Sequence, residues 1–435
     1  MNLSKDPVSK LFLRFLIPAI TGTMVTALYA VADGIFVGQG IGGRGLAAIN
    51  VGYPILTFII AMALGLGMGS STLISINSDN KEFKNSCFSQ TIFVNIIFYI
   101  IMMIFVNVMG DKLFYLLGSN KDLLPMVSDY TNICLWFSIF FTFSIILSSI
   151  VRNDNSPNYA MKSMLIGAGI NIVLDYVLIY HTNLGIKGAA YATGIGQVCS
   201  TLYLIRYFVK GKTFKLVFEK IDLKMLGKMF SIGFPSFILE FAVAFITILF
   251  NKEFFRYMGE VGVSAFSIVA YVFYIFRMLF NGLAQAIQPI ISYNYGHHEF
   301  ARIKKIFMLG HLVSLVISIG ILIMIKFEGY MIVNMFNDNL ELVEVANRGL
   351  LLYSSAMVFL GANFINISYL QSKERARAAN FISINRSMVF VAGALFILPS
   401  QIGVDGVWLA LPCSDFLTFL TTFFFKERKK KLINI

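Results

Sequence analysis

The sequence has little charge and few residues suited to redox or metal chemistry. Only 13% of its 435 residues are charged and 57% are hydrophobic, whereas a soluble globular domain carries about 25% charged residues. The four cysteines are isolated and none forms a CxxC pair, which argues against a zinc site or a disulfide framework. So little charge excludes a water-soluble core of this size, and we expect a chain that lies in a lipid bilayer.

Long apolar runs are what the sequence has instead. A transmembrane helix needs about 20 mostly apolar residues to cross ~30 Å of hydrocarbon. Twelve runs meet this length, and we predict an all-α polytopic membrane protein with twelve transmembrane helices. The predicted spans are 12–37, 48–76, 88–110, 131–151, 160–181, 186–209, 229–250, 262–290, 306–327, 348–370, 380–399 and 404–425.

The distribution of basic residues predicts the topology of these spans. If both termini are cytoplasmic, the cytoplasmic segments hold 26 of the 35 Lys and Arg residues and the opposite segments hold 8. Cytoplasmic loops carry this excess in membrane proteins. We therefore expect a multi-pass, monomeric protein of the plasma membrane. The net charge of +12 is spread over loops, so no nucleic-acid partner is expected.

The two halves of the chain resemble each other at an offset of 217 residues. Pro18 aligns with Pro235 and Gly65 with Gly282. Six helices per half is an even number, so both halves enter the membrane from the same side, as in parallel repeats. We predict an N-terminal lobe at 1–210, a basic cytoplasmic linker at 211–228 and a C-terminal lobe at 229–435.

Pro18 and Pro235 each open a long predicted helix. Proline removes a backbone hydrogen bond and permits a bend, so we expect bends at these positions. Proline is also common in membrane helices without such a role. Gly65 and Gly69 form a GxxxG pair, which predicts close helix packing.

Two aspartates, Asp33 and Asp175, interrupt long apolar runs. A carboxylate in the bilayer centre costs roughly 2.5–3.5 kcal/mol, so it marks a functional site by default. Asn171 lies one turn from Asp175 on the same helix face, and Thr193 lies in the next helix. Oxygen ligands of this kind suit hard cations such as Na⁺, and two close carboxyl groups could instead carry a proton. The alternative is that these groups only join neighbouring helices.

The second half is polar at other positions. Glu240 lies one turn beyond Pro235, and Arg277 lies in the following span with Gln285 further along it. Glu240 and Arg277 could form a structural ion pair, or Glu240 could line a cavity and attract cations. We assign Glu240, Arg277, Gln285 and, from the first half, Gln197 to a candidate substrate cavity. Asp415 is expected near this cavity or at an interface.

Three stretches resemble the multidrug and toxic compound extrusion (MATE) family, in the same order as in that family. They are residues 28–38 (LYAVADGIFVG), 167–175 (GAGINIVLD) and 282–296 (GLAQAIQPIISYNYG). The resemblance covers essentially the whole chain and is closest to the branch that includes DNA-damage-inducible-type members.

This resemblance implies antiport of organic cations against H⁺ or Na⁺. It also implies that Asp33, Asn171, Asp175 and Thr193 form the cation site and that Pro18 matches the proline at which the first helix bends. Glu240 lies in the helix where another branch carries a coupling glutamate.

We therefore predict a secondary antiporter that exports organic cations, with H⁺ or Na⁺ as coupling ion and no other cofactor or metal. A flippase of a lipid-linked or amphipathic anionic substrate is the alternative, and it would need a basic cavity. A membrane enzyme would need a nucleophile with a base or a motif such as HExxH, and the sequence contains neither. We expect no enzymatic activity.

Overall fold

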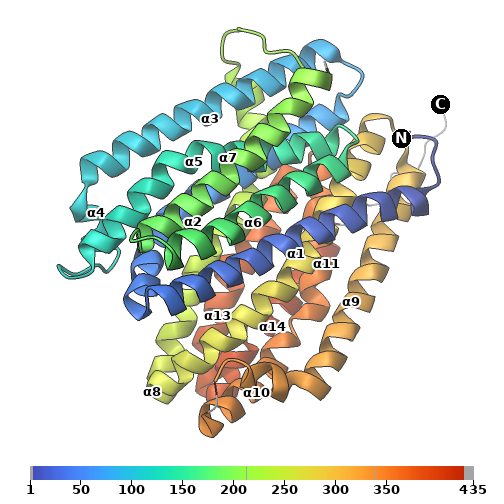
Figure 1. Ribbon diagram of the computed structural model, residues 1–435. Helices are drawn as coiled ribbons and strands as arrows, with labels where there is room; N and C mark the ends of the chain where they lie inside the picture. Colours follow the sequence, from blue (N-terminus) through green and yellow to red (C-terminus); the bar gives the residue numbers. More distant parts are fainter. Residues whose placement is uncertain (1–2, 212, 338, 426–435) are drawn as a thin grey trace.

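The structure is a computed structural model that describes residues 3–211, 213–337 and 339–425. Within these residues the chain forms helices and turns and no strand. Figure 1 shows two groups of helices, one formed by the first half of the chain and one by the second half. The predicted all-α membrane fold is therefore confirmed.

The first group, here called the N-terminal lobe, contains seven helices. They are α1 (Val8–Gly40), α2 (Gly43–Ile76), α3 (Lys81–Met109), α4 (Asp111–Leu116), α5 (Leu124–Asn153), α6 (Pro157–Tyr180) and α7 (Ile186–Gly211). The short α4 is an addition to the six predicted spans of this half, and it follows α3 after a turn at Gly110.

The second group, here called the C-terminal lobe, begins with a very long helix. Its elements are α8 (Leu223–Gly296), α9 (Phe300–Asn334), α10 (Leu340–Ser354), α11 (Met357–Ser372), α12 (Ala376–Ile384), the π-helix η1 (Asn385–Val389), α13 (Phe390–Ile402), α14 (Val404–Thr422) and the 3₁₀ turn η2 (Phe423–Phe425). Residues 223–228, which the sequence assigned to the linker, are already helical.

Helix α8 accounts for two predicted spans. Its 74 residues would extend about 110 Å as one straight helix, far more than the ~30 Å of a bilayer core. Gly259 interrupts it with φ 61° and ψ −144°, a conformation that glycine adopts without a Cβ clash. The chain therefore reverses at Gly259, between the predicted spans 229–250 and 262–290.

Length and composition agree with repeated membrane crossing. Over the described part of the chain, nine helices are long and apolar enough to cross a membrane, or ten if the bent pair α10 and α11, at 42°, counts as one span. Helix α8 is one of the nine although it contains two predicted spans, and α7 is not among them. Helical segments occupy all twelve predicted ranges.

The turns show the internal repeat. Glycines with positive φ lie at Gly42 and Gly259, which are 217 residues apart, and at Gly185 and Gly403, which are 218 apart. Gly403 ends α13 and starts α14. The same turn geometry at equivalent positions is what a parallel repeat predicts.

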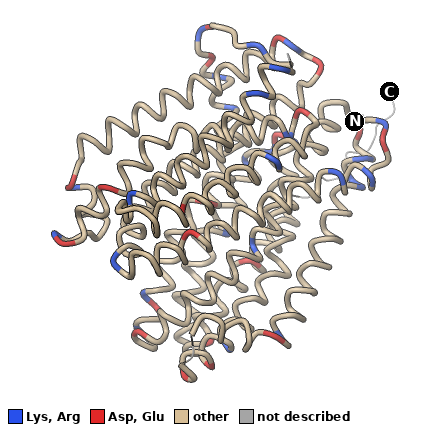
Figure 2. Tube along the Cα trace, in the orientation of Figure 1, with Lys and Arg blue, Asp and Glu red and all other residues tan. Residues whose placement is uncertain are grey.

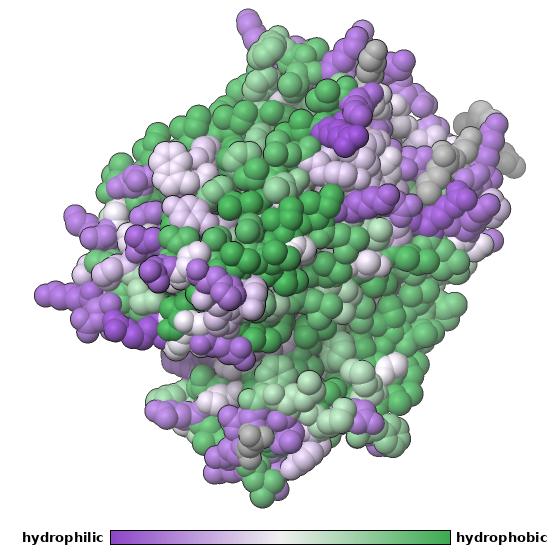
Figure 3. Space-filling model, in the orientation of Figure 1, coloured by the Kyte–Doolittle hydropathy of each residue, from purple (hydrophilic) through white to green (hydrophobic). Residues whose placement is uncertain are grey.

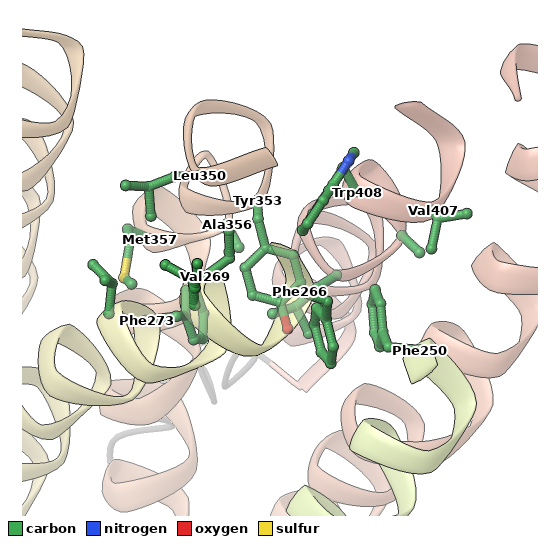
Figure 4. Packing of buried hydrophobic residues seen from close by; sticks show 14 of the residues in the cluster. Phe250, Phe266, Val269, Phe273, Leu350, Tyr353, Ala356, Met357, Val407 and Trp408 are labelled. Carbon is green, nitrogen blue, oxygen red and sulfur yellow. The ribbon is translucent and has the colours of Figure 1, made fainter. Parts of the chain in front are cut away.

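Each lobe has its own hydrophobic core. In the C-terminal lobe, Phe250, Phe266, Tyr353 and Trp408 pack together in one buried cluster, and Figure 4 shows their rings gathered between the helices. Stacked rings such as Phe250 and Phe266, 5.1 Å apart, contribute beyond simple burial of area. A separate cluster, containing Val37, Ile55 and Leu135, fills the N-terminal lobe.

Helix α1 contacts both lobes. Its first half packs against the C-terminal lobe through residues such as Leu11 and Phe15, which share a cluster with Ile287. Its last turn lies against α6, where Gly40 meets Ile179. The helix that carries Asp33 therefore links the two lobes.

The lobes are held together at one end of the molecule. This end, here called the closed end, contains the start of α1 and the loops at 77–80, 154–156 and 297–299, near the labelled N-terminus (Figure 1). The predicted GxxxG contact is confirmed there, because Gly65 and Gly69 meet the backbones of Gly233 and Met229 on α8. At the opposite end the surface is recessed between the lobes (Figure 3).

Candidate functional site

The structure brings Asp33 on α1 and Asp175 on α6 together. Their carboxyl groups lie within hydrogen-bonding reach of each other. Asp175 is fully buried and Asp33 is half-buried. Figure 2 shows that charged residues otherwise gather at the ends of the helices. The pair is therefore an acidic site in the apolar part of the molecule.

The pair has few hydrogen-bond donors. No donor reaches either carboxyl oxygen of Asp175 or Oδ1 of Asp33 among the described residues. The side chains that interact with Asp175 are Asp33 and Asn171, and neither is a cation. A buried charge without a partner is strongly unfavourable. The arrangement thus requires a proton or a small cation between the two carboxyl groups.

Asn171 and Thr193 complete the predicted set of oxygen ligands. The Asn171 amide donates to Thr193 Oγ1 at 3.3 Å, and its own Oδ1 receives no bond. Close contact of α6 with α7 sets this geometry, since a Cβ at Gly196 would lie 2.7 Å from the Gly167 carbonyl oxygen. All four predicted residues therefore lie in one region, and they present oxygen atoms, which hard cations prefer.

Two tyrosines that the sequence analysis did not single out lie beside this pair. Tyr29 and Tyr130 are both within electrostatic reach of Asp33 and Asp175. Tyr29 precedes Asp33 by one helical turn and so shares its face, which was a usable sequence signal. Tyr130 comes from α5, and only the fold places it near the site.

Glu240 and Arg277 form an ion pair in the C-terminal lobe. Arg277 Nη2 lies 3.3 Å from Glu240 Oε2 and donates to the Leu239 carbonyl at 3.2 Å. Tyr53 of the N-terminal lobe is within electrostatic reach of both charges yet remains 47% exposed. The space between these facing groups is therefore accessible to solvent, so the pair is both an internal bond and a lining of that space.

Tyr274 connects the two polar regions. It is within electrostatic reach of Tyr29 and Tyr53 and also of Glu240 and Arg277. A continuous set of polar aromatic side chains therefore runs from the carboxylate pair to the ion pair, across both lobes. Aromatic faces also attract organic cations.

The other predicted cavity residues have local partners. Gln197 accepts a hydrogen bond from Ser144 at 2.7 Å, and Gln285 donates to Asn281 along its own helix at 3.3 Å. Both glutamines are half-buried and they belong to different lobes.

The two predicted helix-bending prolines are buried inside continuous helices. Pro18 lies within α1 and Pro235 within the first part of α8. The helical assignment continues on both sides of each residue, and the non-helical backbone in α8 is at Gly259 instead. Bending at these prolines stays a prediction.

Arg386 was assigned to the loop residues from the sequence, and this assignment is wrong. It is 5% exposed and lies in the π-helix η1, where its Nε donates to Asp415 Oδ1 at 2.6 Å. Asn363 donates to the same oxygen at 3.0 Å. Asp415 is therefore a neutralised partner, unlike Asp175. The signal was present, because Arg386 falls inside the predicted span 380–399.

Metal ligation has little support in this geometry. Among the described residues, no group of three or more His, Cys, Asp or Glu side chains is placed to hold a metal ion. The carboxylate pair supplies only two such side chains, so its remaining ligands would be amide, hydroxyl or water oxygens.

Comparison with known proteins gives a consistent result. The family model described as MatE matches residues 18–177 and 235–395. A multidrug export protein, MepA of Staphylococcus aureus (strain MRSA252), is 25% identical over 426 residues, which are 96% of this chain and 93% of that protein. The MepA protein of Staphylococcus saprophyticus is 24% identical over 413 residues, 94% and 91% of the two chains.

Solved structures agree with the fold. A crystal structure of MATE in complex with MaL6 superimposes with a TM-score of 0.91 at 22% identity, covering 97% of this chain and 96% of that one. An outward-facing conformation of a multidrug resistance MATE family transporter of the MOP superfamily gives 0.91 at 23% identity, with the same coverage. Because the family model spans more than half of the chain, the protein belongs to the MatE family, the multidrug and toxic compound extrusion transporters, and is not an enzyme.

Proposed function

We propose that this protein exports small organic cations from the cell in exchange for H⁺ or Na⁺. The observation that carries the proposal is the Asp33–Asp175 pair, whose carboxyl groups face each other without a donor on Asp175. A site of this kind is stable when a proton or Na⁺ occupies it and is costly when it is empty. The multidrug export described for the MepA relatives supports the choice of substrate.

Rocking of the two lobes is the proposed mechanism. The lobes meet at the closed end, and the surface is recessed between them at the other end (Figure 3). The basic-residue bias places the closed end, with both termini, on the cytoplasmic side of the plasma membrane. The molecule would then be open to the outside in this structure, ready to release substrate and to take up the coupling ion.

Helix α1 offers a route from ion binding to lobe movement. Asp33 lies in its second half, while its first half packs on Ile287 and other residues of the C-terminal lobe. Occupation of the carboxylate pair changes the charge that α1 brings to the N-terminal lobe. A drug cation attracted by the empty pair would lose that attraction once H⁺ or Na⁺ is bound, and it would leave to the outside.

Export of an anionic amphipathic substrate is the competing function. It requires free basic groups in the interlobe space, yet Arg277 is paired with Glu240 and Arg386 with Asp415. The observations therefore favour a cationic substrate. We expect the functional unit to be a monomer, because the proposed pathway lies within one chain.

Uptake of a fluorescent organic cation into inverted membrane vesicles tests the proposal. One arm imposes a pH gradient without Na⁺, and the other imposes a Na⁺ gradient at equal pH. Uptake should follow at least one gradient and should be lost in Asp33→Asn and Asp175→Asn variants that still reach the membrane. Uptake that ignores both gradients would refute antiport, and movement of a fluorescent anionic lipid instead would favour the flippase.

A further inference from the structure

The sequence stretch 282–296 carried the family resemblance, but the proposed exchange site does not use it. In the structure this stretch forms the last part of α8 and runs to the closed end. Gly282 fits closely against Thr23 and Ile20 of α1. The stretch is therefore placed where the lobes meet, and its polar residues need a role there.

Gln288 lies at the centre of this contact. Its Nε2 donates to Thr72 Oγ1 on α2 at 2.8 Å, and its Oε1 accepts from Asn153 Nδ2 on α5 at 2.8 Å. A further bond joins it to Ser292 of its own helix at 3.1 Å. One side chain thus connects two helices of the N-terminal lobe to the C-terminal lobe.

All these groups are withdrawn from solvent. Gln288 is 2% exposed, Asn153 is 6% exposed, and Thr72 and Ser292 are fully buried. An amide in such a place costs free energy whenever a donor or acceptor loses its partner. The bonds of Gln288 can therefore break only where water replaces the lost partners, that is, when the closed end opens.

Neighbouring contacts follow the same two helices toward the loops. Ser75 donates to the Pro289 carbonyl at 3.3 Å, and the backbone of Gly296 meets the Ile76 carbonyl. Beyond them, Asp79 forms an ion pair with His297 at 3.1 Å. The end of α2 and the end of α8 thus run side by side from Gln288 to the loops.

We propose that Gln288 is the interlobe latch of the closed end. It stabilises the closed end through Thr72 and Asn153, and both bonds break when the molecule opens toward the side of the termini. Gln288 acts as a positioning residue that touches no substrate. This inference rests on the proposed function, because only a transporter with rocking lobes must open this end.

The polar character of the latch has a physical reason. When the closed end opens, the same side chains line the pathway, where water satisfies them. Apolar side chains would instead resist wetting. A hydrogen-bonded amide therefore holds the closed state without blocking the open one.

Gln288→Leu tests the latch. The variant leaves Thr72 and Asn153 without this partner in the closed state, whereas water satisfies both when the end is open. Loss of one or two net hydrogen bonds should shift the population toward the open state by about tenfold. Spin labels at Lys81 and Arg377, which are exposed on opposite lobes near the closed end, report the change as a longer distance.

Gln371→Leu is the matched control. Gln371 is 2% exposed, but it donates to the Ile232 carbonyl at 2.8 Å and to Ser236 at 3.0 Å, all within the C-terminal lobe. Its loss should lower stability without changing the label distance. The latch is refuted if Gln288→Leu gives the same distance distribution as the wild type, or if Gln371→Leu gives the same shift.

Thr72→Val keeps the test informative if Gln288→Leu does not fold. It removes one latch bond and leaves Gln288 in place, so a smaller shift in the same direction is expected. Combined with Gln288→Leu, it should add little, because both changes break one bond; full additivity would overturn the proposal. The distances are measured without transport, so a failed antiport assay would disprove the proposed function and leave the latch standing.

Discussion

Two buried aspartates, Asp175 and Asp415, should respond in opposite ways to the same substitution. Both side chains are fully buried. Asp415 accepts hydrogen bonds from Arg386 and Asn363, whereas no donor reaches the oxygens of Asp175. Replacement by Asn therefore removes a satisfied ion pair in one case and an unsatisfied charge in the other.

The effect on folding follows from these partners. Asp415→Asn leaves the Arg386 guanidinium buried without its counter-charge, which costs about 3–5 kcal/mol. Asp175→Asn removes a charge that has no donor, and the new amide can donate to Asp33. We expect Asp415→Asn to lower the thermal unfolding temperature sharply and Asp175→Asn to leave it unchanged or raise it.

The effect on transport runs the other way. A carboxylate about 4 Å from a monovalent cation contributes about 4 kcal/mol at an effective dielectric constant of ~20. This corresponds to roughly a thousandfold in affinity. Asp175→Asn should therefore abolish ion-coupled uptake in vesicles while folded protein remains.

Two measurements on the same preparations check both statements. Thermal unfolding of purified protein in lipid nanodiscs gives stability, and fluorescent-cation uptake into inverted vesicles gives exchange. The reasoning fails if Asp175→Asn unfolds as readily as Asp415→Asn, or if it exchanges at the wild-type rate.

Three further variants test other parts of the structure. Glu240→Gln should raise the KM for organic cations several-fold with folding retained, because Arg277 keeps its bond to the Leu239 carbonyl; an unchanged KM in vesicle uptake would remove the pair from the substrate pathway. Gly233→Ala places a methyl group against the Gly65 backbone and should cost about 1–3 kcal/mol of stability, whereas Gly320→Ala, which has open space around it, should not; equal thermal unfolding of the two would contradict the close contact. Arg302→Ala loses bonds to the Leu3 and Asp6 carbonyls at 2.9 and 2.7 Å, so limited proteolysis before α1 should accelerate roughly tenfold, while the exposed neighbour Lys304→Ala serves as control and equal rates would refute the anchor.

The helices themselves could be predicted from the sequence because membrane insertion is a local requirement. Every backbone group in lipid must find a partner within its own helix, so a sufficiently long apolar run predicts a helix. The offset of 217 residues also predicted equivalent turns, and Gly42 and Gly259 have them. Asp33 and Asp175 stood out for the same local reason, since a charge in an apolar run is costly wherever it packs.

The partners of these charges were decided only by the tertiary structure. Asp175 and Asp415 both interrupt apolar runs, yet Asp175 meets another acid and Asp415 meets Arg386. Gln288 likewise differs from Gln371 only in which lobe holds its partners. Hydrophobicity depends on each residue alone and can be read along the chain, whereas a hydrogen bond or ion pair needs two groups within about 3 Å. Only the packing of distant helices brings such groups together.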